Sequence, residues 1–135
     1  MKVKLADIID AIEFIDPLSN YFLDMETGEI IMISQMIMTP EEMEAAYNTL
    51  DEHGFCSLPT QYELRDYDIM SSFVDSLSGT AHNRLASAIS GRGAFRRFKD
   101  EVQRLGIEDQ WYSWHNEAYK RKAVRWCEEN GIEYE

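Results

Sequence analysis

The stretch GRGAFRRFKD, residues 91–100, decides how the second half of the chain folds. It contains the only Gly-x-Gly of the sequence and leads into two of the three tryptophans. From here onward, apolar side chains recur at intervals that place them on one helix face: Phe95, Phe98, Val102 and Leu105. Gly91 is expected to end the preceding helix and Gly106 to end this one. The pattern therefore predicts a helix that starts near Gly93 and buries its phenylalanines.

The start of this helix is also the best candidate binding site in the sequence. The first N–H groups of a helix lack partners and attract anions, and Arg92 and Arg96 lie close to them. This interpretation makes the corner a phosphate or carboxylate site. The simpler interpretation, which we prefer, is a corner between helices with surface pairs Arg96–Asp100 and Arg97–Glu101, each contributing about 0.2–0.5 kcal/mol. A Gly-x-Gly without a preceding strand is a weak signal for a binding loop.

Aromatic residues that follow the helix extend this candidate site. Trp111 and Trp114 fall at helical spacing and are interpreted as core residues rather than as a stacking platform for bases. Tyr112 and His115 are expected to border the basic patch. The candidate anion-binding residues are therefore Arg92, Gly93, Arg96, Arg97, Lys99, Tyr112 and His115.

Charge is distributed unevenly along the chain, whose formal net charge is −12. Residues 1–64 contain two Lys and thirteen Asp or Glu, whereas residues 84–104 contain six basic and two acidic residues. Duplex nucleic acid would be repelled by the acidic half and attracted only by the basic patch. We therefore do not expect duplex DNA to be a partner.

The sequence also favours a cytoplasmic location. No run approaches the ~20 apolar residues of a membrane span. The first residues, MKVKLADIIDAIEF, meet Asp7 and Asp10 too early for the apolar centre of a signal peptide. Cys56 and Cys127 do not form a disulfide framework and are expected to be free thiols in a reducing compartment. We predict no contact with a membrane.

Helical and extended patterns share the rest of the chain. Two β-rich runs flank Gly28 and read as a hairpin over residues 20–33. Thr39 and Glu42 form a capping box that starts a helix with Met43, Ala46, Tyr47 and Leu50 on its inner face. Thr80 is expected to cap a later helix. Further helices are expected over residues 4–15, 66–78, 80–90 and 108–130, with extended segments at 55–59 and 132–134. We predict an α+β fold: a single small domain, residues 1–135, with an antiparallel β-hairpin near the N-terminus and about six helices packed around it.

No complete catalytic or metal-binding set is apparent. His53 and Cys56 have the spacing of two zinc ligands, but a structural zinc site needs four. Nucleophilic catalysis by Cys56 or Cys127 would need a neighbouring histidine and an oxyanion hole, and no flanking Gly or Ser pattern supports it. Asp24 and Glu26 provide too few oxygens for a calcium loop and are interpreted as turn residues. We predict no catalytic residues, no metal and no cofactor.

Four segments carry a resemblance to known proteins: YFLDMETGEI (21–30), GRGAFRRFKD (91–100), WY (111–112) and RWCEENGIEY (125–134). Together they resemble a family of small bacterial proteins that is described only as an uncharacterised protein family. The resemblance covers most of the chain. It implies a short, soluble bacterial protein and supplies no activity, substrate or catalytic residue.

Three functions remain open at this point. The leading hypothesis is a non-enzymatic cytosolic binding or regulatory protein that acts by contact with an unknown protein partner. The second is a binder of a phosphate-bearing small anion or of single-stranded nucleic acid through the Gly91–Lys99 basic patch. The third is a hydrolase with His115 as its base.

Overall fold

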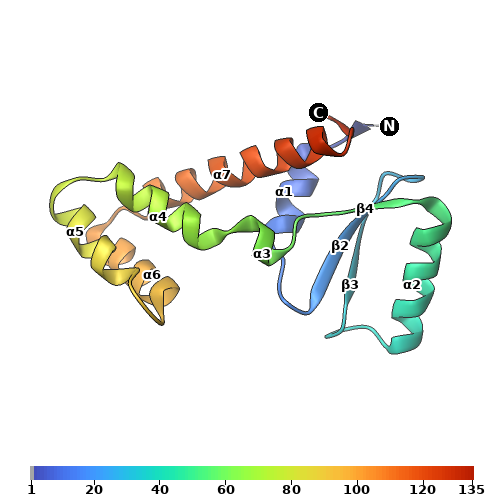
Figure 1. The fold of residues 1–135 in the computed structure, drawn as a ribbon, viewed down its shortest axis with the longest axis horizontal. Helices are drawn as coiled ribbons and strands as arrows, with labels where there is room; N and C mark the ends of the chain where they lie inside the picture. Colours follow the sequence, from blue (N-terminus) through green and yellow to red (C-terminus); the bar gives the residue numbers. More distant parts are fainter. Residues whose placement is uncertain (1) are drawn as a thin grey trace. The chain divides into compact units, whose positions relative to one another are not determined.

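A computed structural model describes residues 2–135, which fall into two compact units (Figure 1). Unit 1 contains the residues up to Leu64 together with Tyr119–Glu135, and unit 2 contains Arg65–Ala118. The long helix α7, Glu108–Glu129, contributes its first half to unit 2 and its second half to unit 1. The expectation of a single domain stays a prediction.

Unit 1 mixes strands with helices, whereas unit 2 is helical. The elements of unit 1 that precede α7 are β1 (Lys2–Val3), α1 (Leu5–Glu13), β2 (Ser19–Asp24), β3 (Ile30–Ser34), α2 (Pro40–His53), β4 (Phe55–Ser57) and α3 (Gln61–Leu64). The short strand β5 (Glu133–Tyr134) follows α7. Unit 2 contains α4 (Asp66–Ser76), α5 (Gly79–Ala88) and α6 (Ala94–Leu105). The described residues thus form seven helices rather than about six, because the four-residue helix α3 has no apolar periodicity to reveal it.

The sheet of unit 1 is antiparallel and has the strand order β3-β2-β4. The predicted hairpin is present as β2 and β3, with Phe22 opposite Ile31, so the prediction is right in part. β4 pairs with the other edge of β2 and turns the hairpin into a three-stranded sheet. A separate parallel pair joins β1 to β5.

Helix α2 covers one face of this sheet (Figure 1), where Phe22, Ile33 and Leu50 form a buried cluster. The predicted capping box is confirmed: the Glu42 N–H donates to Thr39 Oγ1, and the Thr39 N–H donates to the Glu42 carboxylate. Leu50 is the fully buried residue of the helix, whereas Tyr47 stays exposed. Met43 and Ala46 are half-buried against the same cluster, and the Tyr47 ring contacts Phe22 at a centroid distance of 5.8 Å, so the four expected residues do face the sheet, although only Leu50 is fully buried.

The other face of the sheet contributes a second set of buried side chains. Leu23 alternates with Phe22 along β2 and is completely buried. Helix α1 packs against β3 and buries Ile8 and Ile12. Trp126, from the second half of α7, donates its indole N–H to the carbonyl of Ser57 at 2.8 Å. The second half of α7 is thereby joined to β4.

Unit 2 is built around Phe98, whose side chain is only 1% exposed. Its ring makes edge contacts with Phe73 and Trp111, at centroid distances of 6.2 and 4.7 Å. Trp111 and Trp114 pack against this core, as expected. The prediction that Phe95 is buried is wrong, because Phe95 is 48% exposed. The buried positions of α6 repeat every four residues instead: Ala94, Phe98 and Val102.

Two smaller expectations also have outcomes. Thr80 does not cap α5, because the helix already begins at Gly79 and Ser78 occupies the N-cap position. Cys56 and Cys127 are free thiols, as predicted, and burial raises the pKa of Cys127.

Candidate functional site

The corner before α6 has the backbone that the sequence predicted. Gly91 and Gly93 both have positive φ, at 77° and 74°, and Gly93 is the N-cap of the helix. Positive φ is unfavourable for residues with a Cβ, so both positions need glycine. A Cβ added at Gly93 would also lie 3.1 Å from Nη1 of Arg97. A guanidinium therefore packs directly on this glycine.

The Arg97 side chain holds the loop between α5 and α6. Its Nε–H donates to the carbonyl of Ala88 at 2.9 Å. Its two terminal nitrogens donate to the carbonyls of Ser90 and Arg92. The Ala88 and Ser90 carbonyls lie at the end of α5, where helical carbonyls lack intrahelical partners and a cation is favourable. Arg97 thus satisfies backbone acceptors that would otherwise need water.

The two surface pairs predicted for α6 are not the pairs that form. Glu101 Oε1 accepts a hydrogen bond from Arg104 Nη1 at 2.8 Å. Glu101 Oε2 lies 3.0 Å from Arg84 Nη2, an ion-pair distance at which no donor is aligned for a hydrogen bond. The prediction of an Arg97–Glu101 pair is wrong, because the Arg97 guanidinium turns toward the loop carbonyls instead.

A shallow groove of about 560 Å³ lies between α5 and α6 in unit 2. Its charged residues are Arg84, Arg97, Asp100, Glu101 and Arg104, with Asn83 and Ser87 beside them. Arg97 is the one predicted site residue among those that line it. The structure therefore assembles a polar groove at a different place from the expected one, and its basic members Arg84 and Arg104 were not singled out in the sequence.

The remaining predicted site residues lie apart from that groove. Arg92, Arg96 and Lys99 are exposed, as is Tyr112. The His115 ring packs against Trp111 with a centroid distance of 5.4 Å. Trp114 donates its indole N–H to Ser72 Oγ at 3.1 Å. The anion site and the role of His115 as a base both stay predictions.

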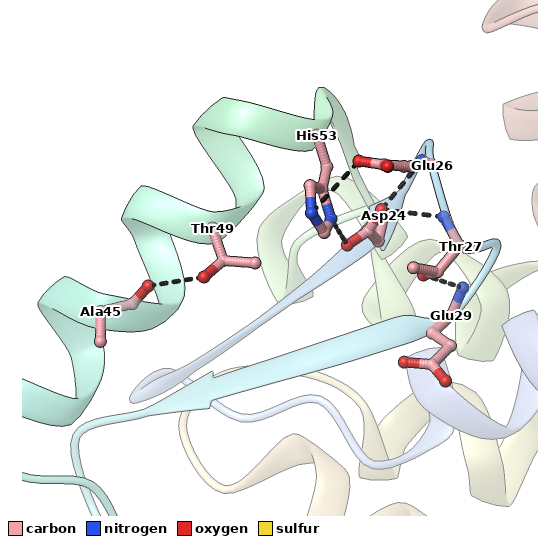
Figure 2. A network of polar contacts seen from close by, with 7 residues as sticks. All are labelled: Asp24, Glu26, Thr27, Glu29, Ala45, Thr49 and His53. Carbon is pink, nitrogen blue, oxygen red and sulfur yellow. Dashed lines mark hydrogen bonds and ion pairs between the residues drawn. The ribbon is translucent and has the colours of Figure 1, made fainter.

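A polar network in unit 1 connects the hairpin turn to the end of α2 (Figure 2). Asp24 is buried, and its Oδ2 lies 2.7 Å from His53 Nδ1. Asp24 Oδ1 accepts the N–H groups of Glu26 and Thr27, which closes the turn. His53 Nε2 lies 3.2 Å from the carboxylate of Glu26. Figure 2 shows the imidazole held between the two carboxylates.

Asp24 and His53 each shift the pKa of the other. The hydrogen bond to Asp24 raises the pKa of His53 above its ordinary value. The hydrogen bond from His53 lowers the pKa of Asp24. Both shifts favour the charged pair, which joins the turn to the helix. The expectation that Asp24 and Glu26 act as turn residues fits this geometry, although the sequence did not link them to His53.

A hydrogen-bonded loop at one end of the sheet presents apolar side chains to solvent. Met36 and Ile37 follow β3 and are each 68% exposed. The loop is fixed at both ends: the Met38 N–H donates to the Ser34 carbonyl at 3.1 Å, and the Met36 N–H donates to Ser34 Oγ. Across the hairpin, the Gln35 N–H donates to the carbonyl of the exposed residue Leu18. We name Leu18, Met36 and Ile37 the apolar end of unit 1.

One uncharged run of the sequence includes Met36 and Ile37 of the apolar end, although the run was not singled out from the sequence. From Ile30 to Met38 the chain reads IIMISQMIM, with no charged residue. A buried strand would account for such a run, but the strand ends at Ser34. Of the apolar residues beyond it, Met38 packs against the Phe22 cluster, whereas Met36 and Ile37 are left exposed. No helix within residues 2–135 has the length and hydropathy needed to cross a membrane.

These features define a small, mostly helical α+β protein with a three-stranded antiparallel sheet. The chain belongs to the uncharacterised protein family UPF0158, which it matches over residues 1–135. It is similar to the UPF0158 protein PA5073 of Pseudomonas aeruginosa, with 26% identity over 116 residues that cover 84% of this chain and 74% of the relative. No solved structure matches.

Proposed function

We propose that this protein is a non-enzymatic binding protein that contacts a protein partner through the apolar end of unit 1. The carrying observation is the loop of Met36 and Ile37, which is fixed by hydrogen bonds and yet exposes both side chains. Covering an exposed side chain of this size stabilises a complex by about 1.5–3 kcal/mol before the costs of association. Exposed apolar residues gathered at one place are typical of interaction sites.

Charge indicates the kind of partner. The residues of unit 1 include six Lys or Arg and seventeen Asp or Glu, a net charge of −11. A basic protein would be steered toward such a surface, whereas an acidic one would be repelled. We therefore expect the partner to have an apolar contact surface bordered by Lys and Arg residues.

Site-specific photo-cross-linking in the native host tests this proposal. A photoreactive phenylalanine analogue at Ile37 should capture a partner protein. The same analogue at Tyr62, which is 90% exposed on α3, serves as the control. Capture at position 37 that is absent at position 62, and that Met36→Ser abolishes, supports the proposal. Equal capture at both positions, or none at position 37, contradicts it.

A second candidate is a binder of small phosphate-bearing anions or of single-stranded nucleic acid. The observation that favours it is the exposure of Arg92, Arg96 and Lys99, whose side chains have no ion-pair partner among the described residues. Arg97 contributes little here, since its guanidinium is bound to backbone carbonyls. Thermal-shift assays with inorganic phosphate and short RNA test this candidate. Stabilisation of the wild type that is lost in an Arg92→Gln, Arg96→Gln variant supports it, and no shift in the wild type rejects it.

We further propose a cytoplasmic location, which two free thiols support. Alkylation of the protein in intact host cells should label both cysteines once the protein is denatured. A disulfide recovered from cells would contradict this location.

A further inference from the structure

The outer edge of β3 has backbone groups that no strand of unit 1 uses. β3 is the terminal strand of the order β3-β2-β4. The Asp24 N–H donates to the Glu29 carbonyl, and the Gln35 N–H donates to the Leu18 carbonyl. Hydrogen-bonded and non-bonded pairs alternate in an antiparallel ladder, so Ile31 and Ile33 bond to β2. The N–H and C=O groups of Ile30 and Met32 therefore face away from β2.

The chain closes only one end of this edge. At Ser34 the N–H donates to Met38 Sδ, and the carbonyl accepts the Met38 N–H. The outward N–H and C=O groups of Ile30 and Met32 have no hydrogen-bond partner within residues 2–135. Proteins usually protect an edge strand with a charge, a proline or a bulge. β3 has none of these from its first residue to its last.

A groove of about 570 Å³ lies beside the first residue of β3 in unit 1. β1 and α1 form one side of the groove, with Asp7 and Asp10 among its residues, and Gly28 to Ile30 form the other. Its charged residues are Lys2, Lys4, Asp7, Asp10 and Glu29. A strand added to β3 would pass Ile30, which lines this groove, and carboxylates outnumber lysines among the groove residues.

We propose that the free edge of β3 binds an extended, basic and apolar peptide segment of the partner protein as an added strand. This inference rests on the proposed function, because the apolar end directly follows the same strand. Main-chain hydrogen bonds to Ile30 and Met32 give the affinity, and the carboxylates of unit 1 select Lys or Arg in the segment. A second copy of the chain is disfavoured as the occupant, since two units of charge −11 repel each other.

Met32→Pro is the sharpest test, because proline removes the outward-facing N–H of Met32 and leaves the bonds between β2 and β3 in place. Met32→Ala is the matched control, since it loses the side chain but keeps the N–H. The probe is a fluorescein-labelled synthetic peptide of alternating Val and Lys, compared with a Val and Glu peptide of equal length. We expect the Val and Lys peptide to bind the wild type. Met32→Pro should weaken it about tenfold, and Met32→Ala clearly less.

Hydrogen exchange of the full-length wild type gives a readout that does not depend on how the proline variant folds. The amides of Ile30 and Met32 should exchange quickly in the free protein and become protected when the Val and Lys peptide is bound. No binding of this peptide, binding that Met32→Pro leaves unchanged, or bound peptide without protection of these two amides would overturn the inference. A dimer in light scattering that Met32→Pro converts to a monomer would overturn it in favour of a second copy.

The two proposals fail in different ways. Cross-linking at Ile37 whose yield is unchanged in Met32→Pro over a range of protein concentrations rejects strand addition and retains contact at the apolar end. Amide protection at Met32, in a protein that cross-links to no partner from position 37, retains the edge as a binding site and rejects the apolar end.

Discussion

Replacement of Arg97 by Met should destabilise unit 2 although the side chain is exposed on the surface of α6. The guanidinium donates to the carbonyls of Ala88, Ser90 and Arg92, which span the turn between α5 and α6. Methionine keeps the length of the side chain and removes all of these donors. The three carbonyls must then find water or stay unsatisfied.

The expected loss follows from the number of bonds. A net intramolecular hydrogen bond contributes about 0.5–1.5 kcal/mol. Because Arg97 is exposed, the lower part of that range applies, about 0.5–1 kcal/mol for each bond. Three bonds give a loss of about 1.5–3 kcal/mol in the free energy of unfolding, which is large for a surface substitution. Arg97→Lys should recover only part of it, because an ammonium cannot reproduce the planar arrangement of donors.

Urea denaturation followed by tryptophan fluorescence measures this loss, since Trp111 and Trp114 pack on the core of the same unit. The matched control is Arg96→Met on the next residue of the helix, whose side chain has no ion pair among the described residues. That substitution should change stability by less than about 0.5 kcal/mol. Equal effects of Arg97→Met and Arg96→Met would refute the role assigned to Arg97.

Three further predictions concern the core and the polar network. Phe98→Ala should cost about 3–5 kcal/mol and Phe95→Ala under about 1, because only the first side chain is buried; similar losses in chemical denaturation would show that the packing of α6 is misassigned. The Asp24–His53 pair should stabilise unit 1 fully between the ordinary pKa values of the two groups, 3.8 for Asp and 6.5 for His, and this stabilisation should fall as the pH drops through the lowered pKa of Asp24 or rises through the raised pKa of His53. The urea midpoint should vary less with pH in Asp24→Asn than in the wild type. An equal pH dependence in the two proteins would contradict this. Cys127 should react slowly with thiol reagents in the native protein because it is buried and its pKa is raised, so rapid labelling would argue against that burial.

Local patterns in the sequence were sufficient for part of the fold. The capping box of Thr39 and Glu42 was predictable because its partners lie three residues apart. The hairpin followed from two β-rich runs around a glycine turn. Each of these features depends only on residues close together in the chain.

Features that join distant residues were not predictable in the same way. Asp24 and His53 are 29 positions apart, and no periodicity connects them. The partners of Arg97 are backbone carbonyls, which every residue has and which the sequence therefore does not mark. The burial of Ala94 in place of Phe95 depends on how α6 rotates to place Phe98 against Phe73 and Trp111. A helical repeat with several apolar positions leaves that rotation open.

The division of unit 1 into two stretches of sequence imposes an order on folding during translation. Unit 2 is one uninterrupted stretch, Arg65–Ala118, and is synthesised before Tyr119 is added. β1 pairs with β5, where Lys2 lies opposite Glu133, and Trp126 bonds to Ser57. The earlier segment of unit 1 must therefore wait for the later one, and during that interval it is accessible to the proteases and chaperones of the cell. The outer edge of β3, which no strand of unit 1 pairs with, is therefore accessible from the time the strand is made.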